Sequence, residues 1–135
     1  MKFAYLQKQM VSILVIALSV LFFWLPSASQ GGQAAPLDKT IQHLIAYVAH
    51  SDLTFVRNSA EYTGKEASEH IQKKYAHFRD KITTPEDFIE LCASRSLLSR
   101  KPYLVINEKG ETIGTKEWLT AELEEYRSKV ADESR

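Results

Sequence analysis

The chain has 135 residues, of which 25% are charged and 44% hydrophobic, with 17 basic and 17 acidic side chains. These fractions are ordinary for one globular domain and exclude a disordered chain and a membrane protein with several spans. The balanced charge lacks the basic field on which nucleic-acid binding depends, so nucleic acid is not expected as a partner.

The first 29 residues have the layout of a secretion signal. Lys2 and Lys8 give a basic start, an almost uninterrupted apolar run extends from Val11 to Leu25, and small residues follow through Ser29. This order is typical of a cleaved signal peptide. We therefore predict a signal peptide over residues 1–29, a flexible leader over 30–36, and a periplasmic or secreted domain that starts at Leu37.

An uncleaved anchor is the alternative interpretation of the same segment. The stretch from Met10 to Leu25 is near the lower length limit for crossing a bilayer, and Phe22, Phe23 and Trp24 resemble an interfacial belt. The domain would then be anchored in the inner membrane and would still face the periplasm. The membrane is expected as a partner only through this segment.

The first half of the domain predicts two helices separated by a strand. Apolar residues at helical spacing predict a helix over residues 37–49, and alternation predicts a short strand over 51–58. A turn is expected at Asn58–Ala60. Thr63 and Glu66 then form the capping-box pattern that opens a second helix, with an apolar stripe that continues to residue 82.

The second half predicts a helix, a hairpin and a last helix. Thr84 and Pro85 indicate the start of a helix that ends near Ser96. A β-rich run over 103–106 and turn residues up to Gly110 indicate a hairpin, and Thr115 can cap a helix that continues to residue 130. The tail, residues 131–135, is expected to fray.

This order of elements predicts an α+β fold. We expect a small antiparallel sheet of about three strands packed with four helices, after an N-terminal signal helix, in a single domain over residues 37–130. Cys92 is the only cysteine, so no disulfide within the chain supports the core. Cys92 lies four residues after Phe88, on the same apolar face of the predicted helix, and this position favours a role in core packing.

Four segments of the domain resemble the YfeK-like family of small exported bacterial proteins. They are Phe55-Val-Arg-Asn58 to Tyr62, the helix from Glu66 to Tyr75, Thr84-Pro-Glu-Asp-Phe-Ile-Glu90, and Ala93-Ser-Arg-Ser96 through Lys101-Pro-Tyr103. The resemblance covers nearly the whole domain. It implies export and a single domain, and it implies no particular activity.

The resemblance also carries two departures. Many relatives have glycine after the Arg-Asn pair, where this chain has Ser59. Some carry cysteines near the positions of Leu53 and Asn107, and a bridge between them would place the first strand beside the hairpin. In this chain apolar packing would have to replace such a link.

The polar residues of these segments are the candidate binding residues. Arg57, whose planar guanidinium matches a carboxylate or a phosphate, forms a possible recognition patch with other residues of the resembling segments. Its expected members are Asn58, Ser94, Ser96, Lys101 and Tyr103. The structural alternative has Asn58 in a turn, the two serines closing the third helix, and Arg57 paired with an acidic neighbour.

Helix residues 66–74 offer the candidate acid–base groups. His70 or Lys74 would act with Glu66 or Glu69 in an enzyme that modifies envelope material. Structural alternatives are an exposed pair between Glu66 and His70, and a lysine that lies along the apolar surface with its charge in water. We include His70 and Lys74 among the candidate binding residues.

Neither a metal site nor a cofactor is predicted. His77 lies seven residues from His70, about 10 Å along a helix, which is too far for both to bind one ion. Without a converging catalytic set, the sequence favours a non-enzymatic domain that binds a protein or another component of the cell envelope. An aromatic patch near Trp118 or Tyr103 would favour this interpretation.

Overall fold

Helix α2 (Ala34–Ala49) opens the part of the chain that the computed structural model describes, residues 34–135. The predicted signal peptide lies outside the described residues, as do residues 30–33 of the predicted leader. The helix begins three residues before the predicted start at Leu37. Its buried stripe has the predicted helical spacing and consists of Ile41, Leu44, Ile45 and Val48.

The sheet has four strands, one more than the approximately three predicted, and every neighbouring pair is antiparallel. The strand order is β2-β1-β3-β4. The bounds are β1 (Thr54–Arg57), β2 (Ala60–Tyr62), β3 (Leu104–Ile106) and β4 (Thr112–Gly114). The strand that the sequence did not predict is β2, which has three residues and buries none of them fully. The α+β class is confirmed.

A two-residue turn makes β2 possible. Asn58 and Ser59 have φ angles of 53° and 68°, and Arg57 pairs directly with Ala60. Two successive left-handed residues give the turn type whose twist matches a hairpin. Glycine adopts this conformation most readily, so Asn58 and Ser59 hold it at some cost in backbone strain.

Helix α3 (Gly64–Phe78) begins at the predicted capping box. The Thr63 hydroxyl accepts from the Glu66 amide, and the Glu66 carboxylate accepts from the Thr63 amide at 2.9 Å. The helix ends at Phe78 and continues as a 3₁₀ turn, η3 (Arg79–Lys81). Ile82, the last residue of the predicted stripe, is buried beyond that turn.

The third predicted helix is shorter than expected and changes its winding. After the Thr84 cap, α4 (Pro85–Phe88) passes into a π-helical turn, η4 (Ile89–Ala93), three residues short of Ser96. This segment supplies several of the best buried core residues, and Phe88 has no exposed surface.

The last helix, α5 (Thr115–Glu133), extends three residues past the predicted end at residue 130. Its N-cap is Gly114, so the prediction that Thr115 caps the helix is wrong. Thr115 is instead the first helical residue, and its amide donates to the Tyr103 carbonyl at 2.9 Å. That bond ties the start of α5 to the chain just before β3.

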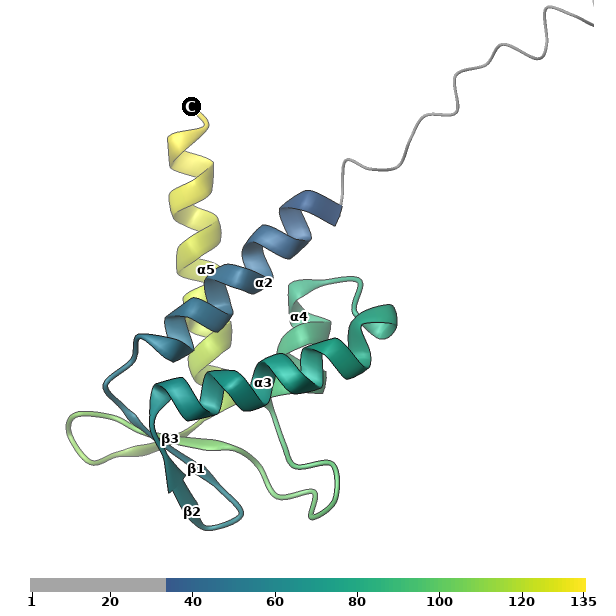
Figure 1. Ribbon diagram of the computed structural model, residues 1–135. Coiled ribbons are helices and arrows are strands. Elements are labelled where there is room, and N and C mark those ends of the chain that lie inside the picture. Colours follow the sequence, from purple (N-terminus) through teal and green to yellow (C-terminus); the bar gives the residue numbers. More distant parts are fainter. Residues whose placement is uncertain (1–33) are drawn as a thin grey trace, which may run out of the picture. The chain divides into compact units, whose positions relative to one another are not determined.

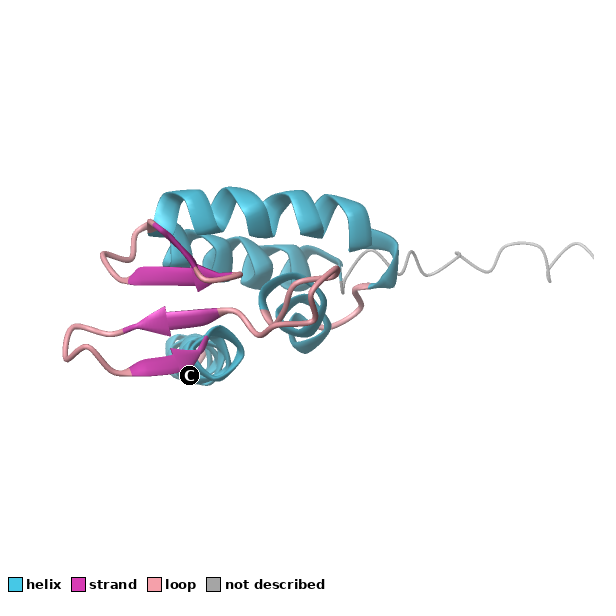
Figure 2. Cartoon of the chain, turned by 90° about the horizontal axis from the view of Figure 1, so that it is seen from below, coloured by secondary structure: helices cyan, strands magenta, loops and turns pink. Residues whose placement is uncertain are grey.

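The helices divide the sheet between them, as Figures 1 and 2 show. Helix α3 packs against β1 and β2, α5 packs against β3 and β4, and α2 contacts both helices. Among the described residues, the buried members of the shared core run from Ile41 to Leu123. No helix in residues 34–135 is both long and apolar enough to cross a membrane.

The two hairpins meet through β1 and β3. Thr54 pairs with Ile106, which places Leu53 and Asn107 at the adjoining position of the ladder. The implied proximity of the first strand and the hairpin is therefore confirmed. Phe55, paired with Val105 in this register, is buried and supplies the apolar packing at this junction.

Candidate functional site

Arg57, His70 and Tyr103, three of the predicted binding residues, line one pocket between α3 and the sheet. The pocket is narrow, with a cavity volume of about 30 Å³ and an opening to solvent. Its remaining lining is mostly apolar and consists of Phe55, Val56, Tyr62, Glu66, Ala67, Ile71, Leu104 and Thr115. We call it the Arg57 pocket.

His70 reaches across the pocket from α3 to the sheet. Its Nε2 lies 3.0 Å from the hydroxyl of Tyr103, and the two rings meet edge to face at a centroid distance of 5.8 Å. The predicted pairing of His70 with Glu66 is absent, because the Glu66 carboxylate is bonded to Thr63. The hydrogen bond instead holds α3 to the segment that enters β3.

The imidazole of His70 is neutral at physiological pH. Partial burial lowers its pKa to about 4, and the nearby charges of Arg57, Lys74 and Lys73 act in the same direction. Burial also raises the pKa of Tyr103 above its ordinary value of 10.0. The pocket therefore contains a neutral histidine and a neutral tyrosine beside a permanent cation.

The low pKa of His70 predicts that acid destabilises the fold. Between pH 6.5 and about 4 the unfolded chain binds a proton at this residue and the folded chain does not, so stability falls as the pH falls. Full burial would make the loss about 3 kcal/mol, and partial exposure reduces the expected loss to about 1–2 kcal/mol.

Denaturant titrations of the wild type and of His70→Gln across this pH range measure the effect. The stability of the wild type relative to His70→Gln should be constant above pH 6.5 and should fall by about 1–2 kcal/mol toward pH 4. Parallel pH profiles for the two proteins would contradict the assignment.

Arg57 has no acidic partner in the described part of the chain. Its guanidinium carbon lies 4.5 Å from the centre of the Tyr62 ring, and none of the ion pairs of residues 34–135 includes it. The alternative in which an acidic neighbour neutralises Arg57 is therefore wrong. A cation held over an aromatic ring keeps its hydrogen-bond donors available to a ligand.

Thr115 adds a hydroxyl to the same pocket. Its side chain is buried, and its Oγ1 has no hydrogen-bond partner among the described residues. Buried hydroxyl groups nearly always find a partner in proteins, so an unpartnered one in a pocket wall marks a position for a polar group of a ligand or a water.

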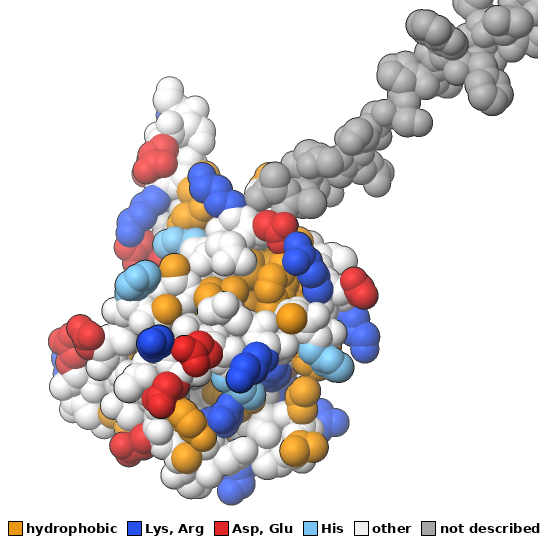
Figure 3. Space-filling model, viewed as in Figure 1, with side chains coloured by type: hydrophobic (Ala, Val, Ile, Leu, Met, Phe, Trp, Pro, Cys, Tyr) orange, Lys and Arg blue, Asp and Glu red, His pale blue; other side chains and the backbone are white. Residues whose placement is uncertain are grey.

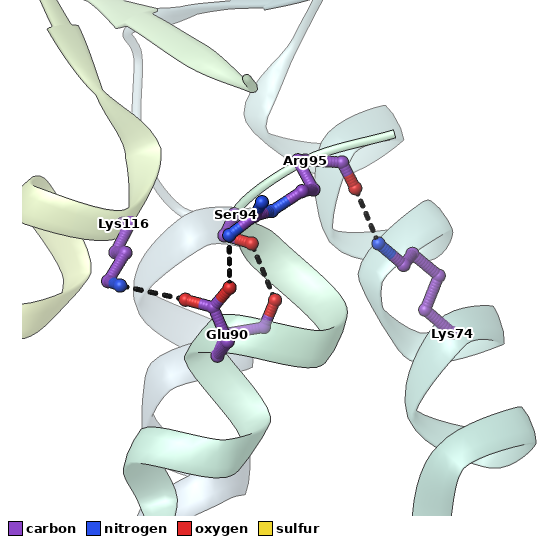
Figure 4. Close-up of polar contacts among 5 residues, drawn as sticks. All are labelled: Lys74, Glu90, Ser94, Arg95 and Lys116. Atoms are coloured by element: carbon purple, nitrogen blue, oxygen red, sulfur yellow. Dashed lines mark hydrogen bonds and ion pairs between the residues drawn. The ribbon is translucent and has the colours of Figure 1, made fainter. Parts of the chain in front are cut away.

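Lys74 is buried beside the pocket, contrary to the expectation that its charge reaches water. Its exposed fraction is 6%, and its amine donates to the Arg95 carbonyl at 2.8 Å (Figure 4). The amine also lies 5.0 Å from the centre of the Tyr103 ring. Burial lowers the pKa of the amine, and the Arg57 and Arg95 charges add to that effect while Cys92 opposes it.

An ion-pair network holds the segment after η4 in place (Figure 4). The Glu90 carboxylate contacts the guanidinium of Arg95 and the amine of Lys116, the latter at 2.7 Å. The buried hydroxyl of Ser94 donates to the Glu90 carbonyl. Ser94 therefore closes the third helix, as the structural alternative predicts.

The remaining predicted binding residues lie outside the pocket. Asn58 occupies the β1–β2 turn and accepts a hydrogen bond from the Ser99 hydroxyl at 2.6 Å. Ser96 is buried in the loop after η4, where its hydroxyl accepts from the Ser99 amide. Lys101 is exposed in the same loop.

The acid–base alternative gains no support from this geometry. Glu69 is exposed, and no hydrogen bond or ion pair of the described residues joins it or Glu66 to His70 or Lys74. Hydrogen bonds from Thr63 lower the pKa of Glu66, which keeps its carboxylate ionised and unsuited to donate a proton.

Cys92 is buried, and burial raises the pKa of its thiol to about 11, so the thiol is unreactive.

A second polar and aromatic cluster, between α2 and α5, was missed in the sequence. His43 lies 2.6 Å from the Glu122 carboxylate and stacks on Tyr126 at 4.0 Å, while Tyr47 stacks on Trp118 at 4.6 Å. Sequence spacing could have indicated this cluster, because His43 and Tyr47 are four residues apart in α2, and Trp118, Glu122 and Tyr126 follow one another at four-residue intervals in α5. Trp118 in this cluster is partly buried, and Tyr47 is 36% exposed.

Together these features define a small α+β domain with a narrow, mostly apolar pocket that Arg57, His70 and Tyr103 also line. The described residues contain no converging catalytic set. The family model for a family of unknown function, DUF5329, matches residues 35–127. The chain belongs to this family, and the resemblance to YfeK-like proteins is confirmed.

One curated relative shows how far the similarity reaches. The chain is 42% identical over 60 residues to the uncharacterized protein YfeK of Salmonella typhimurium, which covers 44% of this chain and 50% of the relative. The match thus spans about half the length of that protein. No solved structure matches the chain.

Proposed function

We propose that this protein is an exported, non-enzymatic binding protein of the bacterial cell envelope. Export rests on the signal layout of residues 1–29, with an uncleaved anchor as the alternative. The observation that carries the binding role is Arg57, an arginine without an acidic partner that lines a largely apolar pocket.

The pocket favours a carboxylate on a short apolar stem. The guanidinium of Arg57 provides a planar pair of donors for a carboxylate, which a lysine does not offer. The walls formed by Phe55, Ile71 and Leu104 suit the stem, and the Thr115 hydroxyl offers one further hydrogen bond. A cavity of about 30 Å³ has room for one small polar group, such as the carboxylate of an acidic side chain or of a chain end, and has no room for a large cofactor.

Site-directed photo-crosslinking in intact cells tests this proposal. A photoreactive residue in place of the exposed Glu69, which adjoins His70 on α3, should give a discrete product with the partner protein. The same residue at exposed Glu124 on α5 should not give it. Arg57→Gln should reduce the product at least tenfold, about the worth of one charged hydrogen-bonded pair.

Arg79→Gln is the matched control, because the Arg79 guanidinium also lies over a tyrosine, at 5.7 Å from the Tyr75 ring. Arg79→Gln should leave the yield of crosslinked product unchanged.

A periplasmic extract of the same cells tests export. Mass spectrometry of the protein in that extract should find an N-terminal peptide that begins near Gln30 or Ala35. An intact Met1 in that extract would contradict cleavage.

A further inference from the structure

The loop between η4 and β3 exposes two leucines at its tip. Leu98 is 97% exposed and Leu97 is 51% exposed, the two largest exposed fractions among the large hydrophobic side chains of residues 34–135. We call residues 95–102 the Leu97–Leu98 loop. Leu98 buries almost none of its side chain in this fold and Leu97 buries only half, so the pair forms an exposed apolar tip.

Hydrogen bonds hold the loop in one shape. The Ser96 amide donates to the Lys101 carbonyl at 3.0 Å, the Arg100 amide donates to the Ser96 carbonyl at 3.1 Å, and Arg95 pairs with Pro102. The Ser99 hydroxyl also ties the loop to Asn58 in the β1–β2 turn. An ordered loop presents its leucines with little further loss of conformational entropy on binding.

The charge of the loop is entirely basic. Arg95, Arg100 and Lys101 are its charged residues, and it has no acidic side chain. Arg95 is paired with Glu90, whereas Arg100 and Lys101 have no ion-pair partner among the described residues. Figure 3 shows hydrophobic and basic side chains next to one another at the lower right, where Figure 1 places this loop.

We propose that the Leu97–Leu98 loop docks on the surface of an anionic phospholipid bilayer. The two leucines enter the boundary between headgroups and acyl chains, and Arg100 and Lys101 contact the lipid phosphates. The two leucines project at the tip of the loop, and the basic residues Arg100 and Lys101 follow them in the chain. This arrangement suits the deformable surface of a bilayer, whereas a rigid protein partner would need a matching groove. This docking is independent of a ligand in the Arg57 pocket.

Co-sedimentation with lipid vesicles tests the proposal. The protein purified without its predicted signal segment, with its fold checked by circular dichroism, is mixed with vesicles of equal parts phosphatidylglycerol and phosphatidylcholine, and with phosphatidylcholine alone. Binding is expected to the anionic vesicles only, and it should weaken as salt is added.

Two double variants separate the apolar and the electrostatic contributions. Leu97→Ser with Leu98→Ser, and Arg100→Gln with Lys101→Gln, should each reduce partitioning by about tenfold or more. Both pairs are exposed, so circular dichroism should show unchanged folding. The matched control is Ile113→Ser in β4, a 37% exposed apolar side chain away from the loop, which should bind as the wild type does.

Three results would overturn the proposal. They are equal binding to both kinds of vesicle, binding that neither double variant reduces, and no binding to the anionic vesicles.

Discussion

Replacement of Phe88 by alanine should lower the free energy of unfolding by about 3–5 kcal/mol. Phe88 has no exposed surface and meets the Tyr75 ring edge to face at 5.6 Å, so its removal costs both apolar burial and an aromatic contact. The loss is large because Phe88 lies where α4 passes into the π-helical turn, where the backbone cannot easily collapse into the space. Urea unfolding followed by circular dichroism measures it.

Phe78→Ala is the control for this prediction. Phe78 shares the apolar stripe of α3, but it is only partly buried and packs at the edge of the core. Phe78→Ala should therefore lower the free energy of unfolding clearly less than Phe88→Ala does. A loss below about 1 kcal/mol for Phe88→Ala would mean that the core is not centred on this residue.

Gly64→Ala should also destabilise the fold, by about 1–3 kcal/mol, although alanine normally favours a helix over glycine. A Cβ at this position would lie 2.3 Å from the Val48 carbonyl oxygen and 2.5 Å from that of Ser51. Both atoms belong to the backbone, so the start of α3 would have to move away from the end of α2.

Gly114→Ala is the matched comparison, because the atoms that its Cβ would meet belong to the flexible side chain of Glu117. Its cost should be small, since that side chain can turn away. Thermal unfolding of the two variants side by side distinguishes them. Equal midpoints would contradict the close approach of α2 and α3 at Gly64.

Local signals in the sequence predicted the helices and the starts of α3 and α4. The Thr63–Glu66 capping box and the Thr84–Pro85 start signal each depend on residues close in the chain, so they are visible without tertiary information. Strand β2 was missed because it depends on two left-handed residues, Asn58 and Ser59, where glycine would have been the usual signal. Thr115 was misread because its bond partner, Tyr103, lies before β3.

The sequence indicated several residues of the candidate site, but it did not indicate how they are arranged in space. Arg57, His70 and Tyr103 were named from the sequence, but the pocket that joins them needs the docking of α3 on the sheet. The burial of Lys74 depends on the Arg95 carbonyl, 21 residues away, which no local pattern indicates. Lys101 and Ser96 belong to the Leu97–Leu98 loop instead of the pocket.

The most direct test of the central claim is the yield of the Glu69 crosslink in cells that express wild-type protein, Arg57→Gln or Arg79→Gln. The account predicts one partner protein, captured equally by the wild type and Arg79→Gln and at least tenfold less by Arg57→Gln. Equal capture by all three proteins, or no product from the wild type, would contradict a binding role for the Arg57 pocket.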